Sequence, residues 1–489
     1  MNNPYNLLAI DLGAESGRTI LGQFDGNTLS LTDINRFPNG GVALPDGLHW
    51  DVLRLWSEIK NGVGQAHQKF GKLQSIGIDT WGVDFGLLDN QGSLLYNPFH
   101  YRDSRTDHMV EEAFKIIPRE EIFDQTGIQF MQLNSLFQLF SMVKNHSPAL
   151  TIASTFLTMP DLFNYWLTGK KVSEFTIATT TQCFNPRTNQ WAFSILERLG
   201  IPTHIFPEIV PPGTILGDFS RYVADELGTT MQVIAPACHD TGSAVAAVPA
   251  HGDDFIWISS GTWSIMGVSL PEAIINNKSL TYNITNEGGV GNTYRFSKNI
   301  MGLWLIQECR RTWNKQGENY SYNDLTQMAA QVDGLVSIFN PDDAEFLKPG
   351  DMPFRIQEVC RRSNQSIPSN HASIIRSALD SIALKYRWTL EKVEEITGKK
   401  ISSIHIVGGG TQNQLLSQLT ADCTGKTVIT GPIEATAIGN LLVQLIALRE
   451  IKDMNEAREV VRNSFDVKTY FPQKNLTWDV AYQKFLTLI

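Results

Sequence analysis

The stretch "AIDLGAESGR", residues 9–18, decides how the rest of the sequence is interpreted. An apolar run ends at Asp11, glycine and small polar residues follow, and Arg18 precedes a second apolar run. This pattern is typical of an ordinary β-hairpin turn. Small residues also allow the backbone to approach a ligand closely, and successive N–H groups can bind an anion. By itself, the stretch is compatible with both a plain turn and a phosphate-binding loop.

Two later stretches favour the phosphate-binding interpretation. The segment "SSGTWS" at 259–264 repeats the plan of a turn between two strands, and "IVGGGTQN" at 406–413 places three glycines after a buried strand. The sequence has no G-x-x-x-x-G-K-[ST] motif, and no G-x-G-x-x-G follows a strand and opens a helix. These absences exclude a P-loop and a dinucleotide-binding Rossmann fingerprint.

Composition limits the class of protein. A chain of 489 residues, 42% hydrophobic and 18% charged, is expected to form two or more globular domains. Its net charge of -10 argues against a nucleic-acid partner. No apolar run approaches the roughly 20 residues that span a bilayer, and the N-terminus lacks a signal-peptide pattern. We therefore expect a cytoplasmic protein without a membrane partner.

The cysteines predict neither a disulfide framework nor a zinc site, because none of them has CxxC spacing. We expect all five to be buried free thiols: Cys183, Cys238, Cys309, Cys360 and Cys423.

The pattern of short strand-like runs at the N-terminus occurs again in the middle of the chain. Short apolar runs dominate 5–37, and "DFIWISSGTWSIMGVSL" at 254–270 repeats the plan of strand, small-residue turn and strand. This similarity of plan indicates an internal duplication, with a domain boundary near 247–253. A helical apolar face runs through 373–397 and is expected to end at Gly398.

The three loops, in this order, resemble those of the sugar kinase, hsc70 and actin ATPase superfamily. In that resemblance, 9–18 is the first phosphate loop, 259–264 the second and 406–413 the adenosine loop. The blocks "MPDLFNYWLTG" at 159–169 and "GPIEATAIGNLLVQ" at 431–444 are similar to blocks of the FGGY carbohydrate kinases.

The resemblance implies an α/β fold of two ribonuclease H-like domains with an ATP and sugar cleft between them. Residues 1–248 would form an N-terminal domain with the sugar site and the first phosphate loop. Residues 249–489 would form a C-terminal domain with the second phosphate loop and the adenosine loop.

Three further stretches resemble the members of the family that act on L-rhamnulose. They are "SIGIDTWGVDFGLLD" at 75–89, "YRDSRT" at 101–106 and "KNIMGLWLIQE" at 298–308. The implied reaction is the ATP-dependent formation of L-rhamnulose 1-phosphate in L-rhamnose degradation, with Mg²⁺ as the cofactor. The implied partners are this sugar and ATP, and the expected state is a monomer or homodimer. A kinase for L-fuculose, L-ribulose or xylulose, and a non-catalytic nucleotide or sugar sensor, remain open alternatives.

The resemblance also implies roles for single residues. Asp240 takes the position of the general base, which suits a carboxylate that accepts a hydroxyl proton during phosphoryl transfer. Asp11 would hold the metal through water. The implied ATP-binding residues are Ala14, Glu15, Ser16, Gly17, Arg18, Thr262, Gln307 and Gly409. The implied sugar-binding residues are Gly82, His239, Asp240, Thr241 and Asn299.

Several of these residues also have a purely structural interpretation. Asp240 could be a helix N-cap, since aspartate ranks among the best residues there. His239 could be a polar residue with satisfied hydrogen bonds beside a core strand. Trp81 could belong to the core rather than form a wall for the sugar. Asp79 and Asp84 could serve only to fix the turn that they flank.

Overall fold

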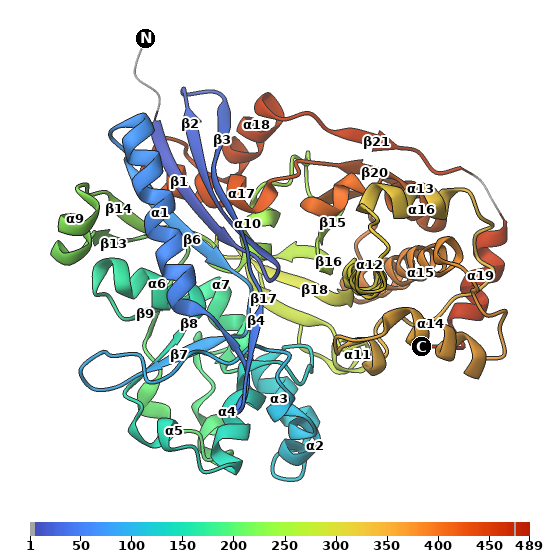
Figure 1. Cartoon of the computed structure of the whole chain (residues 1–489), viewed down its shortest axis with the longest axis horizontal. Helices are drawn as coiled ribbons and strands as arrows, with labels where there is room; N and C mark the ends of the chain where they lie inside the picture. The colour runs from blue at the N-terminus through green and yellow to red at the C-terminus, as the bar shows by residue number, and fades with distance from the viewer. Residues whose placement is uncertain (1–4, 474–475) are drawn as a thin grey trace. The chain divides into compact units, whose positions relative to one another are not determined.

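The computed structural model describes residues 5–473 and 476–489, which fold as two compact α/β units (Figure 1). The first unit contains the chain up to Pro249 and also takes in two segments from the second half of the chain, Ser269–Phe296 and Ala435–Phe465. The second unit consists of Ala250–Val268, Ser297–Glu434 and Asp466–Ile489.

A six-stranded sheet forms the centre of the first unit, with strands in the order β13-β14-β6-β1-β2-β3. Strand β1 is antiparallel to β2 and parallel to β6, and β14 is parallel to β6. The carboxyl ends of β14, β6 and β1 therefore lie at the same edge. The strands are β1 (Tyr5–Leu12), β2 (Ser16–Phe24), β3 (Leu29–Pro38), β6 (Ser75–Thr80), β13 (Thr214–Asp218) and β14 (Gln232–Ala235).

Helices pack against both faces of this sheet. Side chains alternate between the two faces along each strand, so neighbouring residues of β2 contact different helices. On β2, Thr19 lies against α1 (Val52–Phe70), where a Cβ on Gly62 would be 2.1 Å from its Oγ1. Gly22, an odd number of positions away, faces Leu441 of α17 (Ala435–Ala447) on the opposite side. The sheet is thus the middle layer of three.

The second sheet has seven strands in the order β17-β18-β16-β15-β19-β20-β21. Strand β15 is antiparallel to β16 and parallel to β19, and β19 is parallel to β20, which repeats the pairing around β1. The predicted internal duplication is confirmed. The strands are β15 (Phe255–Ser260), β16 (Trp263–Leu270), β17 (Thr285–Gly288), β18 (Tyr294–Met301), β19 (Ser403–Val407), β20 (Thr427–Thr430) and β21 (Lys468–Tyr470).

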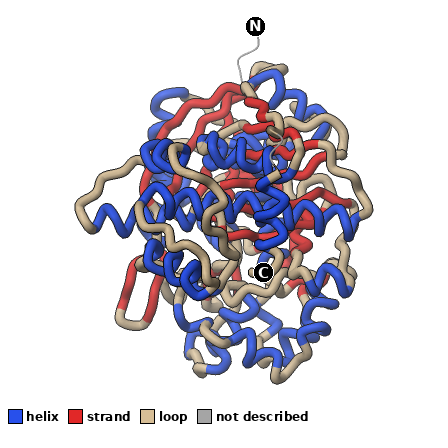
Figure 2. Tube along the Cα trace, turned by 90° about the vertical axis from the view of Figure 1, so that its right-hand side faces the viewer, coloured by secondary structure: helices blue, strands red, loops and turns tan. Residues whose placement is uncertain are grey.

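The predicted long helix is α15 (His371–Thr397), which ends at Gly398 with a φ of 69°. Its Tyr386 hydroxyl is 2.5 Å from Ser264 Oγ, so the helix lies on the face of β16. Figure 2 shows the strands in red and the helices in blue. The remaining longer helices are α4 (Ser135–Lys144), α6 (Met159–Thr168), α12 (Trp304–Lys315), α13 (Tyr322–Ala330), α14 (Met352–Arg362), α16 (Gln414–Thr424), α18 (Met454–Ser464) and α19 (Thr477–Phe485).

Shorter elements complete the two units. The helices are α2 (Met109–Phe114), α3 (Arg119–Thr126), α5 (Pro148–Ile152), α7 (Phe175–Ala178), α8 (Phe193–Arg198), α9 (Arg221–Leu227), α10 (Asp240–Ala246) and α11 (Asn277–Thr281). The strands are β4 (Gly41–Leu44), β5 (Gly47–Trp50), β7 (Phe85–Leu88), β8 (Thr155–Thr158), β9 (Val172–Glu174), β10 (Phe184–Asn185), β11 (Gln190–Trp191) and β12 (Glu208–Val210).

The prediction for the cysteines is confirmed, because all five are free thiols and all five are buried. Burial also raises the pKa of the Cys183 thiol to about 12, so this thiol stays protonated. No helix within residues 5–473 and 476–489 is both long and apolar enough to cross a membrane.

Helices α10 and α17 approach each other most closely at Gly439. A Cβ at this position would lie 1.7 Å from the backbone oxygen of Ser243 and 2.6 Å from its carbonyl carbon. Since backbone atoms cannot rotate away as a flexible side chain can, Gly439→Ala must push the helices apart. We expect it to lower the free energy of unfolding by about 3 kcal/mol, measured from the urea unfolding midpoint.

Gly64 on α1 provides the matched control, because an added methyl group would meet no described atom within 4 Å beyond its chain neighbours and the nearby backbone of its own helix. Gly64→Ala is expected to raise the free energy of unfolding by up to about 1 kcal/mol through helix propensity. A Gly439→Ala protein with the wild-type unfolding midpoint would contradict the close approach of α10 and α17.

Candidate functional site

The carboxyl ends of the parallel strands in the first unit bring several predicted residues together. The Thr80 N–H donates to the Cys238 carbonyl at 2.9 Å, and the Trp81 N–H donates to the Leu12 carbonyl at 3.2 Å. The segments that follow β14, β6 and β1 are therefore neighbours. Ligands of α/β proteins commonly bind at this edge of a sheet.

The predicted first phosphate loop is the tight turn between β1 and β2. The Gly13 N–H donates to the Ser16 carbonyl at 3.0 Å and closes the turn. Gly17 has a packing role as well, because a Cβ there would lie 2.2 Å from the Phe37 ring. Arg18 donates from Nε and Nη2 to Oδ2 of Asp11, at 2.8 and 2.5 Å. The loop is a hairpin turn in form, and a guanidinium group lies at its base.

A second acidic residue lies beside Asp11. Asp79 is its direct neighbour in the register of β1 and β6, and it is fully buried. Asn440 donates to Asp79 Oδ2 at 2.6 Å, whereas no hydrogen-bond partner within the described chain reaches Oδ1. Burial, and then the nearby Asp11 carboxylate, raise the pKa of Asp79 well above its usual range.

This pair of carboxyl groups fits a divalent cation of the Mg²⁺ type, which prefers oxygen ligands. Among the described residues, no group of three or more His, Cys, Asp and Glu side chains could enclose a metal ion. The two carboxyl groups would therefore suit a hydrated ion that they contact through water.

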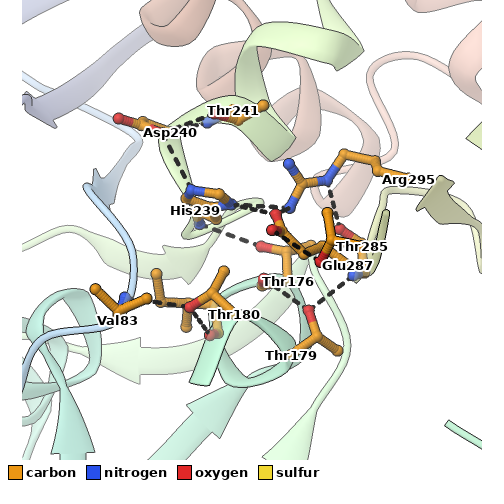
Figure 3. Close-up of polar contacts among 12 residues, drawn as sticks. Val83, Thr176, Thr179, Thr180, His239, Asp240, Thr241, Thr285, Glu287 and Arg295 are labelled. Atoms are coloured by element: carbon orange, nitrogen blue, oxygen red, sulfur yellow. Dashed lines mark hydrogen bonds and ion pairs between the residues drawn. The ribbon is translucent and has the colours of Figure 1, made fainter. Parts of the chain in front are cut away.

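Asp240 is the first residue of α10, and His239 is the N-cap residue of this helix. The alternative that Asp240 is an N-cap is wrong by one position. Its Oδ1 accepts from the Thr241 N–H at 2.5 Å and from Thr241 Oγ1 at 3.1 Å, and lies 3.4 Å from His239 Nε2 (Figure 3). None of the hydrogen bonds between described residues reaches Oδ2. The carboxylate is thus held by one oxygen, and its side chain is 30% exposed.

Two charged residues that the sequence reasoning missed lie behind His239. Arg295 on β18 and Glu287 on β17 have side chains that are 0% and 5% exposed. Arg295 Nη2 is 2.8 Å from His239 Nδ1 and 3.1 Å from Glu287 Oε2. Burial lowers the pKa of the Arg295 guanidinium, and Glu287 counteracts that effect. The available signal was a charged residue within the strand-like segment "TYRFS".

Gly82 lies against this histidine. A Cβ on Gly82 would be 3.3 Å from His239 Nε2 and 3.3 Å from Thr180 Oγ1. The next residue, Val83, has a φ of 69°, which is rare for a β-branched residue. Its N–H donates to Thr180 Oγ1 at 3.2 Å, and its carbonyl accepts from Ser135 Oγ. The surrounding hydrogen bonds therefore hold a strained turn next to His239.

The structural interpretation holds for Trp81 and Asp84. Trp81 is 4% exposed, and its ring centroid is 3.9 Å from that of Trp50, which favours a core role over a wall for a ligand. Asp84 Oδ2 accepts from both indole N–H groups, at 2.9 Å from Trp81 and 2.6 Å from Trp50. Burial raises the pKa of Asp84 to about 6, while these hydrogen bonds oppose the shift.

The remaining predicted residues belong to the second unit. Thr262 lies in the turn between β15 and β16, and its carbonyl accepts from the Trp304 N–H at 3.0 Å, where α12 begins. Gln307 follows on that helix, and within the described chain its buried Oε1 has no hydrogen-bond partner.

The glycine turn after β19 meets the end of β15. A Cβ on Gly410 would lie 2.0 Å from Ser260 Oγ, so only glycine fits there, and Gly409 beside it is exposed. The structure thus brings Thr262, Gln307 and Gly409 to neighbouring segments. Asn299 lies half-buried on β18.

Known proteins match this chain over nearly its full length. The N-terminal domain model of the FGGY family of carbohydrate kinases matches residues 6–247, and the C-terminal domain model matches residues 256–448. A rhamnulokinase of Bacteroides thetaiotaomicron is 43% identical over 481 residues, which cover 98% of this chain and 98% of that protein. A rhamnulokinase of Oceanobacillus iheyensis is 43% identical over 463 residues, which cover 95% and 97%.

Solved structures show the same fold at low sequence identity. A xylulose kinase from Lactobacillus acidophilus has a TM-score of 0.79 at 17% identity, covering 98% of this chain and 96% of that chain. A glycerol kinase from Plasmodium falciparum with ADP has a TM-score of 0.75 at 16% identity, with the same coverage. The family models and these structures confirm the predicted two-domain α/β fold. The chain belongs to the FGGY family of carbohydrate kinases and is itself a carbohydrate kinase.

Proposed function

We propose that this kinase transfers the γ-phosphoryl group of ATP to O1 of L-rhamnulose, forming L-rhamnulose 1-phosphate and ADP. The observation that carries the choice of sugar is the similarity, over nearly the full chain, to proteins named rhamnulokinase. The site in the first unit supports the reaction type, because it presents a partly exposed carboxylate beside a close backbone approach.

Asp240 is the general base in this proposal. Its Oδ2 takes the proton of the O1 hydroxyl while that oxygen attacks the γ-phosphorus, and the bond from phosphorus to the ADP oxygen breaks in line. A positioned base makes a neutral hydroxyl a competent nucleophile. The fixed Oδ1 supports this role, because the hydrogen bonds from Thr241 orient the carboxylate before the sugar binds.

The remaining predicted residues bind the two substrates. The backbone at Gly82, together with His239, Thr241 and Asn299, contacts the sugar hydroxyl groups. The turn from Ala14 to Arg18 binds the ATP phosphates, and its N–H groups and guanidinium stabilise the charge that develops on them. Thr262, Gln307 and Gly409 complete the nucleotide site. In this proposal, residues 1–248 supply the first phosphate loop and the sugar contacts other than Asn299, and 249–489 supply Asn299 and the other two loops.

Asp11 holds Mg²⁺ through water in this proposal, with Asp79 as its acidic neighbour. When bound with ATP, the metal neutralises phosphate charge in the transition state. Arg18 keeps the Asp11 carboxylate in place through its two hydrogen bonds to Oδ2.

A ketose panel tests the proposed substrate. The purified protein is assayed for ADP formation with ATP, Mg²⁺ and L-rhamnulose, L-fuculose, L-ribulose or xylulose in turn. We expect kcat/KM to be highest for L-rhamnulose by about tenfold or more, since hydroxyl-directed hydrogen bonds discriminate strongly between sugars.

Two results of the panel would contradict the proposal that L-rhamnulose is the substrate. A higher kcat/KM for another ketose would assign the protein to that sugar. Binding of a sugar or nucleotide without any turnover would favour the sensor alternative.

A further inference from the structure

We infer that Arg295 and Glu287 are positioning residues for Asp240, which they reach through His239. Together they hold His239 neutral with its proton on Nε2, and this leaves Oδ2 of Asp240 as the oxygen that accepts the sugar proton. The consequence for catalysis rests on the proposed function. The protonation state of His239 is a property of the protein alone and can be measured without a substrate.

The contact between Arg295 and His239 defines the tautomer. Arg295 Nη2 lies 2.8 Å from His239 Nδ1, and a guanidinium group can only donate hydrogen bonds. Nδ1 must therefore be the unprotonated acceptor nitrogen. In a neutral imidazole the proton then resides on Nε2, which lies 3.4 Å from Asp240 Oδ1 and points toward it (Figure 3).

Glu287 makes this arrangement possible inside the protein. Its Oε2 lies 3.1 Å from Arg295 Nη2 and 3.3 Å from His239 Nδ1. The carboxylate balances the charge of a fully buried guanidinium, which would otherwise carry a large desolvation penalty. The same carboxylate would accept a proton-bearing Nδ1 if Arg295 did not occupy that nitrogen. The tautomer therefore depends on Arg295.

Both ends of this network are anchored to the backbone. Arg295 Nε donates to the Gly288 carbonyl at 2.8 Å, and the Gly288 N–H donates to Thr179 Oγ1 at 2.7 Å. The His239 N–H donates to Thr176 Oγ1 at 3.2 Å. The backbone of His239 and the hairpin that carries Arg295 are thus both tied to the segment 176–179, which limits where imidazole and guanidinium can meet.

The consequence for Asp240 is that its two carboxylate oxygens have different roles. Oδ1 faces three groups, namely the Thr241 N–H, Thr241 Oγ1 and His239 Nε2. Oδ1 already accepts two hydrogen bonds from Thr241, and these bonds stabilise its charge and make it a poorer proton acceptor. Oδ2 has no such donor among the described residues, so it takes the proton. If the proton of His239 were on Nδ1, the lone pair of Nε2 would instead face the Asp240 carboxylate.

The first experiment reads the tautomer directly in the full-length wild-type protein. The protein is labelled with ¹⁵N-histidine, and side-chain nitrogen resonances are recorded at neutral pH without substrate. The resonance that disappears in His239→Gln is assigned to His239. We expect a neutral ring with the hydrogen on Nε2 and an unprotonated Nδ1. A hydrogen on Nδ1, or a doubly protonated ring, would overturn the inference.

The second experiment removes the guanidinium in Arg295→Met. We expect the hydrogen of His239 to move to Nδ1, where Glu287 accepts it. We also expect kcat with L-rhamnulose to fall about 10–100-fold because the base is misoriented, while KM for the sugar changes by less than about threefold. A purely structural role for Arg295 would leave the wild-type tautomer and kcat in place in the folded variant, and that result would overturn the inference.

Arg376→Met serves as the matched control, because Arg376 also pairs with a buried carboxylate, Asp380, at 2.9 Å. The Arg376→Met variant measures how much stability is lost with a buried ion pair. We expect its kcat and its His239 resonance to equal those of the wild type. Should Arg295→Met not fold, the wild-type spectrum still decides between the tautomers. Should L-rhamnulose not be the substrate, the spectrum is unaffected, which separates failure of this inference from failure of the proposed function.

Discussion

Asp240→Asn is expected to lower kcat by about 10²–10⁴-fold, or about 3–5 kcal/mol of transition-state stabilisation. The geometry makes this substitution selective. The asparagine carbonyl oxygen can take the place of Oδ1 and accept the Thr241 N–H, which keeps the side chain in position. Its amide group then occupies the place of Oδ2, and an amide cannot accept the sugar proton.

Measurements of kcat, sugar affinity and the melting temperature separate loss of the base from loss of the fold. Since the hydrogen bond to Thr241 is retained, we expect the affinity and the melting temperature to stay close to those of the wild type. Asp225→Asn is the control, because Asp225 lies on α9 in an exposed ion pair with Arg221, and its kcat should not change. Near wild-type kcat in Asp240→Asn would remove Asp240 from the mechanism.

Removal of divalent metal is expected to lower the rate by more than about 10²-fold, and added Mg²⁺ should restore it. The reason is electrostatic. Asp11 already engages the guanidinium of Arg18, and among the described residues no set of three or more ligands encloses a cation. In the proposed mechanism the metal binds together with ATP, and the charge of the triphosphate would be poorly compensated without it.

The metal test needs a direct assay, because coupling enzymes for ADP can require Mg²⁺ themselves. ADP is separated and quantified after incubation with excess EDTA, with and without excess Mg²⁺. An unchanged rate in EDTA would contradict the metal requirement. As a control, the melting temperature in EDTA should equal that without it, because the proposed ion has no structural role.

Local patterns predicted single elements and the internal duplication, whereas the two-domain architecture followed from the resemblance to the sugar kinase superfamily. The strands β1, β2 and β15, the turn glycines and the helix α15 with its end at Gly398 follow from periodicity and from the backbone freedom of glycine, which act over a few residues. The alternative that placed the helix N-cap at Asp240 was wrong by one residue, and this error also concerns only a few neighbouring residues. Helix ends differ by one or two positions for reasons that a single sequence does not contain.

The network behind His239 could not be predicted, because long-range pairing creates it. Glu287 and Arg295 reach His239 only after β17 and β18 pair and the hairpin contacts Thr179, directly after α7. The contacts of α17 have the same origin. Gln444 donates to the Leu8 carbonyl at 2.9 Å and accepts from Ser75 Oγ at 2.6 Å, across more than 360 positions of sequence. A buried charge in a strand signals that a partner exists but not which residue it is.

The identity of the product tests the central claim most directly. L-Rhamnulose is incubated with the protein, ATP and Mg²⁺, and the ³¹P spectrum of the product is recorded with proton coupling. We predict a sugar phosphate whose phosphorus couples to the two hydrogens on C1, formed together with an equal amount of ADP. A phosphate attached at another carbon, or no sugar phosphate while another ketose is converted, would contradict the assignment.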